Sequence, residues 1–201
     1  MTRSTWRYAA ARVITEAFQP PIVVAVMMLV SPAGSPGFPE TFWYGVVAAM
    51  FTCVIPFIVL VALVRAGKVT DHHVSDRRQR GPVLALTLVI VVVGLAILAL
   101  MGAPASVLAM VLALVGGIAL LAIVSLAWKI SGHAAAITSA AVSLLYLFGP
   151  QWWPALVLVP AVIWSRLVLR AHTLAQLLAG AGFGGAVIVG LWLVLLAWLG
   201  P

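Results

Sequence analysis

The stretch SRLVLRAHTLAQ (residues 165–176) is a polar interruption between two long apolar runs, at residues 152–169 and 174–198. Arginine and histidine are costly next to hydrocarbon. In a membrane protein they therefore face the bundle interior or its aqueous mouth, and they usually mark a functional site. The tripeptide Ser131-Gly132-His133 is placed similarly, at the start of another apolar run. Both segments supply candidate site residues.

Composition sets the class of protein. The chain has 201 residues, of which 65% are hydrophobic and 7% charged, and its mean hydropathy is +1.23. A soluble domain could not bury this much apolar side chain, so the solvent must be lipid. We expect an all-α, polytopic transmembrane bundle of six core spans in a single domain (residues 1–201). An amphipathic N-terminal segment leading into a short apolar run that ends at about Val30 is the candidate for an extra N-terminal span.

Counting the spans predicts where the polar stretches lie. Two apolar runs separate the polar stretch 65–82 from Ser131, and two more separate Ser131 from Arg166. An even number of crossings returns the chain to the same side of the membrane. All four histidines and all eleven Lys and Arg residues then fall on one face, where we expect one composite site.

The residue types on this face suit a phosphate group. Guanidinium groups bind phosphate oxygens in bidentate pairs, and backbone N–H groups at helix starts also bind anions. Arg166, Arg80 and the first turn after Ser131 could supply both. Histidine can act as nucleophile or proton donor near neutral pH, and His172 and His133 are available.

The ordered pair of motifs resembles a known family. Ser131-Gly132-His133, followed by Ser165-Arg166, five residues and His172, is similar to the second and third motifs of the type 2 phosphatidic acid phosphatase superfamily. That superfamily includes lipid phosphate phosphatases, bacterial acid phosphatases and vanadium haloperoxidases. The resemblance covers roughly residues 60–195.

The resemblance implies roles for these residues. His172 would attack phosphorus to form a phosphohistidine, and His133 would protonate the leaving oxygen, without a metal or another cofactor. The substrate would be a lipid phosphate. The implied phosphate ligands are Arg166, Arg80, Ser131 and Gly132.

The first family motif, a lysine followed after six residues by Arg-Pro, is degenerate here. Counting back from Arg80 places His73 at the lysine position, and Gly81 separates Arg80 from Pro82. Another cation would have to replace the lysine. The candidates are Arg77, Arg78, Lys68 and Lys129.

The third motif usually ends in aspartate, where this chain has Gln176. Residues i and i+4 share a helix face, so we expect the Gln176 side-chain carbonyl to accept a hydrogen bond from the His172 ring. Glutamine here also resembles the polyprenyl diphosphatase branch, which favours isoprenoid phosphates. Phosphatidate, phosphatidylglycerol phosphate and polyprenyl mono- or diphosphates all remain open.

Other functions are compatible with parts of the pattern. Ser131 could serve an intramembrane serine protease, although this leaves the arginines unexplained, and a non-catalytic lipid carrier or flippase is a third reading. The pair His72-His73 could suggest a metal, but adjacent residues point apart and no spaced ligand set accompanies them. The basic residues belong to membrane loops, so we expect no nucleic acid partner. The oligomeric state is open.

Basic loops favour the cytoplasmic side of a membrane. Five basic residues on the motif face have no expected phosphate role: Arg3, Arg7, Arg12, Arg65 and Arg170. We therefore expect a multi-pass protein of the cell membrane with its site on the cytoplasmic face. Labelling of cysteines placed at Ser75 and Ser35 by an impermeant thiol reagent in intact cells distinguishes the two orientations.

Overall fold

A computed structural model describes residues 3–35, 37–72, 74 and 76–200. Within that part of the chain every regular element is helical. In chain order the elements are α1 (Arg3–Ala17), α2 (Pro20–Val30), η1 (Ser31–Gly34), α3 (Phe42–Ala49), η2 (Met50–Val54), α4 (Ile55–Arg65), α5 (Arg77–Leu100), α6 (Ala105–Ala127), α7 (Gly132–Phe148), η3 (Pro150–Val157), α8 (Leu158–Val168), α9 (Leu174–Gly182), η4 (Phe183–Ile188) and α10 (Val189–Leu199).

The elements form a bundle of membrane-spanning helices. Five segments of the described chain are long and apolar enough to cross a bilayer, and the α1–α2 pair, bent by 41°, is a sixth candidate. α7 is apolar but shorter, with 17 residues. The all-α, polytopic fold expected from composition is confirmed. The five long segments are Phe42–Arg65, Arg78–Leu100, Ala105–Ala127, Pro150–Val168 and Leu174–Leu199.

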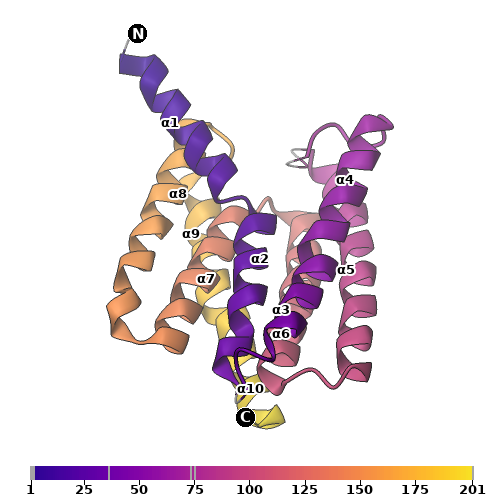
Figure 1. Cartoon of the computed structure of the whole chain (residues 1–201). Coiled ribbons are helices and arrows are strands. Elements are labelled where there is room, and N and C mark those ends of the chain that lie inside the picture. Colours follow the sequence, from indigo (N-terminus) through magenta and orange to yellow (C-terminus); the bar gives the residue numbers. More distant parts are fainter. Residues whose placement is uncertain (1–2, 36, 73, 75, 201) are drawn as a thin grey trace.

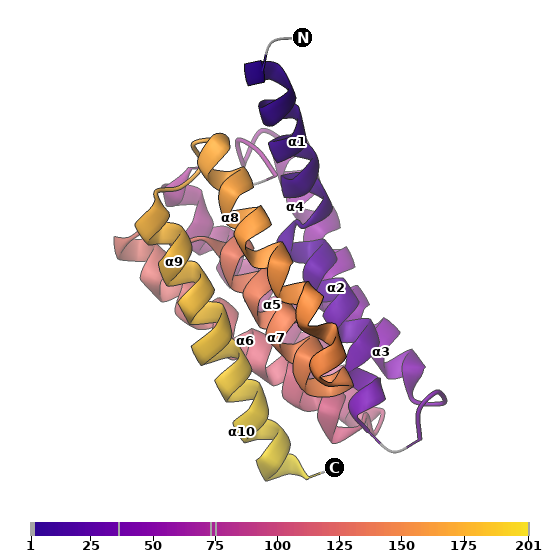
Figure 2. The same ribbon diagram turned by 90° about the vertical axis from the view of Figure 1, so that its left-hand side faces the viewer.

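The polar ends of the helices gather at one end of the bundle. The N-terminus, the α4–α5 loop and the α8–α9 loop lie at the upper end in Figure 1, and the C-terminus lies at the lower end. Figure 2 shows the same arrangement from the side. A backbone hydrogen bond from Ser131 N–H to the Gln176 carbonyl brings the start of α7 to the same end. The three polar stretches thus share one face, as the span count predicts.

Two glycines allow the C-terminal helices to approach α7 closely. A Cβ atom at Gly180 would lie 2.4 Å from the Ser131 carbonyl oxygen, and one at Gly184 would lie 2.1 Å from that of Ala135. Real Cβ atoms do not approach so closely. Small residues serve this purpose at many helix contacts in membranes, because the backbones pack directly against each other. These contacts hold α9 beside the residues that follow Ser131.

We expect Gly184→Ala to destabilise the protein, because the added methyl group must push η4 away from α7. Overpacking of this kind costs about 1–3 kcal/mol. Thermal unfolding of the purified protein in detergent measures the effect. Gly182→Ala is the matched control, since its Cβ would meet nothing within 4 Å. Equal unfolding temperatures for the two variants would contradict the close packing.

Candidate functional site

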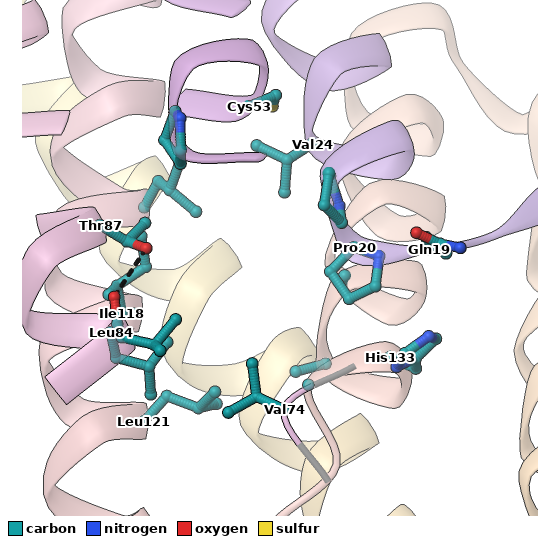
Figure 3. A pocket seen from close by; sticks show the side chains of 18 of the residues that line it. Gln19, Pro20, Val24, Cys53, Val74, Leu84, Thr87, Ile118, Leu121 and His133 are labelled. Carbon is teal, nitrogen blue, oxygen red and sulfur yellow. Dashed lines mark hydrogen bonds between the residues drawn. The ribbon is translucent and has the colours of Figure 1, made fainter. Parts of the chain in front are cut away.

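The site lies at the polar end of a cavity inside the bundle. The cavity has a volume of about 290 Å³. Its polar wall is formed by Arg80, His133, Arg166 and His172, with His72 and Gln19 nearby. The remaining wall is mostly apolar and comes from α2, η2, α4, α5, α6, α7 and η4. Figure 3 shows His133 and Cys53 on different sides of the cavity, with Leu84 and Ile118 on the wall across from Pro20.

The stretch from Arg166 to His172 reverses direction through a helix C-cap. The Ala171 N–H donates to the Arg166 carbonyl and the Arg170 N–H donates to the Leu167 carbonyl, each at 3.0 Å. This pair of bonds is the Schellman arrangement, which needs a left-handed residue at its turn. Arg170 takes that conformation, with φ of 51°. The turn returns the chain toward the bundle, where Arg166 and His172 are both buried on the same cavity.

The expected hydrogen bond between His172 and Gln176 is not made, and this prediction is wrong. α9 begins at Leu174, so His172 precedes the helix and the i, i+4 relation does not hold. The Gln176 side chain instead accepts from the Thr173 N–H at 3.1 Å, and the Thr173 hydroxyl accepts from the Gln176 N–H at 3.4 Å. Thr-x-x-Gln is the sequence signature of this capping box, and it could have revealed the helix start.

Ser131 begins α7 as its N-cap. Its Oγ accepts from the Ala134 N–H at 3.3 Å, and its side chain is completely buried. Gly132 and His133 form the first turn and line the cavity. The N–H groups of a first turn lie outside the helix's own ladder and carry partial positive charge. An anion can therefore bind against this turn.

Arg80 is held by two backbone carbonyls. Its Nε donates to the Val74 carbonyl at 3.0 Å, and a terminal nitrogen donates to the Ile130 carbonyl at 3.4 Å. Ile130 precedes Ser131, so these bonds place the guanidinium beside the start of α7. Val74 has φ of 47°, which is strained for a β-branched residue. No motif in the sequence indicates that these two carbonyls position Arg80.

Lys129 shares the electrostatic environment of the arginines. It is half-buried, and its pKa is lowered first by burial and then by the positive charges of Arg80 and Arg166, while Asp71 opposes this. Among the cations considered for the missing first-motif lysine, Lys68 and Arg78 are exposed. Of these three cations, Lys129 is the one whose pKa responds to Arg80 and Arg166. His73 and the Arg77 side chain lie outside the described residues.

The environment of His172 favours a neutral imidazole. Its pKa is lowered to about 3, first by burial and then by the positive charges of Arg166, Lys129 and Arg80. The backbone of Ile130 acts in the opposite direction and is the smallest contribution. Within the described chain, neither ring nitrogen of His172 nor the buried Nε of Arg166 has a hydrogen-bond partner of good geometry. Buried polar atoms are usually satisfied by a protein group, by ordered water or by a bound molecule.

The described residues contain no group of three or more His, Cys, Asp and Glu side chains placed to hold a metal ion. Comparisons with family models, with curated proteins and with solved structures found no match for this chain. The arrangement of the site therefore carries the functional argument. It offers cations, a helix N-terminus and two histidines at the end of an apolar cavity.

We expect replacement of a neighbouring cation to raise the pKa of His172. Positive charge disfavours the imidazolium, so Arg166→Gln or Lys129→Gln should move the pKa upward from about 3, and burial should keep it below the ordinary 6.5. Histidine ring NMR signals followed against pH measure this, with His172→Ala assigning the signal. The control is Lys68→Gln, which removes an exposed cation. An unchanged pKa in both site variants would contradict the described charge arrangement.

Proposed function

We propose that the protein is a membrane lipid phosphate phosphatase that works through a phosphohistidine on His172. The observation that carries this proposal is that Arg80 and Arg166 line the same cavity as His172, whose pKa is lowered by both arginines and by Lys129. A phosphate dianion would satisfy these groups together. The motif resemblance to the type 2 phosphatidic acid phosphatase superfamily points to the same reaction.

The proposed reaction has two steps. A neutral ring nitrogen of His172 attacks phosphorus, the bond to the lipid oxygen breaks, and His133 gives its proton to the leaving alkoxide. Water then attacks the phosphohistidine, His133 takes the water proton, and phosphate leaves. Arg166, Arg80, Lys129 and the first turn of α7 would stabilise the charge on the phosphoryl oxygens, where fixed donors are most effective.

The apolar part of the cavity supports a lipid as the substrate. It is lined by side chains such as Val24, Leu84 and Ile118, and it reaches the cations at one end. Its volume of about 290 Å³ is at the lower limit for ligand pockets, about 300–1,000 Å³. A cavity of that volume can hold the first part of one hydrocarbon chain of a lipid more readily than two such chains. We therefore favour an isoprenoid phosphate over a diacyl lipid.

The alternatives fit less well. A serine protease would need the Ser131 hydroxyl at the cavity, but it is completely buried and caps α7. A lipid carrier would explain the cavity and would not need His172. Phosphate release from purified protein offered isoprenoid monophosphates, isoprenoid diphosphates and phosphatidate separates these functions. The proposed cytoplasmic orientation of the site would give it access to newly made lipid phosphates.

His172→Ala should lower phosphate release by roughly 10³-fold or more, because the nucleophile of a covalent step has no substitute. It should also abolish an acid-labile phosphoenzyme. His133→Ala should slow an alkyl phosphate strongly but an aryl phosphate with a good leaving group much less, since that group needs no proton. Rapid-quench trapping and phosphate release measure both effects. Activity of His172→Ala within tenfold of the native protein would disprove the mechanism.

Leu84→Trp should block the cavity and raise KM for a long-chain isoprenoid monophosphate by roughly tenfold, a cost in the range of overpacking. A short, water-soluble alkyl phosphate should be affected little, because it does not reach Leu84. The matched control is Leu86→Trp on the same helix, at a residue that is exposed and does not line the cavity. An equal change in KM for both substrates would mean that the isoprenoid chain of the substrate does not lie beside Leu84.

A further inference from the structure

The C-terminal end of α1 is fastened to α8 beside Arg166. Thr15 is 1% exposed, and its Oγ1 lies 3.1 Å from the Oγ of the fully buried Ser165. The Ser165 hydroxyl also donates to the Val162 carbonyl at 2.8 Å. A serine hydroxyl has only one hydrogen, so Thr15 must be the donor to Ser165. This hydrogen bond therefore joins α1 to Ser165, which directly precedes Arg166 and lies 150 positions further along the chain than Thr15.

This attachment falls where α8 is weakest. Helix ends fray, and α8 ends at Val168, so Arg166 lies in the last turn. The Schellman bonds fix the backbone that follows Arg166. The hydrogen bond from Thr15 holds the side chain of Ser165, which directly precedes Arg166 in the last turn of α8. In Figure 2, α1 lies against the upper part of α8.

The neighbouring residues of α1 extend the contact toward the cavity. The carboxylate of Glu16 acts electrostatically on Arg166, and its Oε2 lies 4.0 Å from Nε2 of His72. Gln19 and His72 both line the cavity. Gln19, which follows α1, thus contributes to the wall of the cavity, and Glu16 links the end of α1 to the loop between α4 and α5.

We propose that the C-terminal end of α1 is a positioning element for Arg166, and that Thr15 transmits this effect through Ser165. The inference rests on the proposed role of Arg166 as a phosphate ligand. A guanidinium binds phosphate best in a fixed bidentate geometry, and a displacement of about 1 Å can cost up to about 10²-fold in rate. Thr15 itself does not touch the substrate, since it does not line the cavity.

The experiment compares Thr15→Val with Val13→Thr, the reverse exchange at an exposed residue of the same helix. The first readout is the pKa of His172 by ring NMR, which requires no activity. Loss of the Thr15–Ser165 hydrogen bond should let Arg166 move away from His172. The pKa of His172 should then rise, but by less than it rises in Arg166→Gln. The second readout is the affinity for inorganic phosphate, which should fall about five- to tenfold, the worth of one hydrogen bond. Thr15→Ser keeps a hydroxyl group, so its His172 pKa and its affinity for inorganic phosphate should match those of the native protein.

Ser165→Ala completes the test as a double-mutant cycle with Thr15→Val. If Thr15 acts through Ser165, the double variant should be no worse than the single ones. A lower unfolding temperature in Thr15→Val, with an unchanged His172 pKa and unchanged phosphate affinity, would show a merely structural role and overturn the inference. Absence of phosphate release from every lipid phosphate would overturn the proposed function instead. The His172 pKa in Thr15→Val would still decide the role of α1.

Discussion

Repulsion among three cations in a partly buried pocket is the constraint on which the site depends. Arg80, Lys129 and Arg166 lie close enough to act on one another and on His172. Charges taken out of water repel strongly, because the surrounding protein screens them less than water does. The structure compensates in part through the carbonyls that hold Arg80 and through Asp71 and Glu16 nearby. A bound dianion would remove the remaining imbalance, so the pocket is arranged for an anion before one arrives.

The same arrangement makes the two ends of the cavity different in charge and polarity. All of its cationic side chains are at one end, and the walls between Val24, Leu84 and Ile118 are apolar. An amphiphile can fill such a space in only one orientation, with its anionic head at the cations and its chain in the bundle. The chain would then hold the head in place, and binding energy from the chain would become available to position the phosphate. The apolar wall is therefore part of the proposed catalytic arrangement as well as a binding surface.

The sequence was sufficient for the fold and for the meeting of the main site residues, because both follow from counting. Hydropathy defines the spans, and an even number of spans between polar stretches brings Arg80, His133, Arg166 and His172 to one end. Other features depend on tertiary packing. The carbonyls of Val74 and Ile130 carry no sequence signal as ligands of Arg80. The expected bond from His172 to Gln176 requires a helix that runs through His172, whereas the Thr-x-x-Gln capping box makes Thr173 the N-cap and starts α9 at Leu174.

The capping box bears on how His172 would act as the proposed nucleophile. A carboxylate at Gln176 would favour the imidazolium and would fix the ring by a hydrogen bond, whereas this glutamine is occupied at the start of α9. His172 is kept neutral by burial and by the surrounding cations, and neutral imidazole is the form that can attack phosphorus. When a phosphate dianion binds, it offsets the positive field and favours the positive charge that develops on the ring during attack. The substrate itself would thus supply the negative charge that the missing carboxylate would otherwise provide.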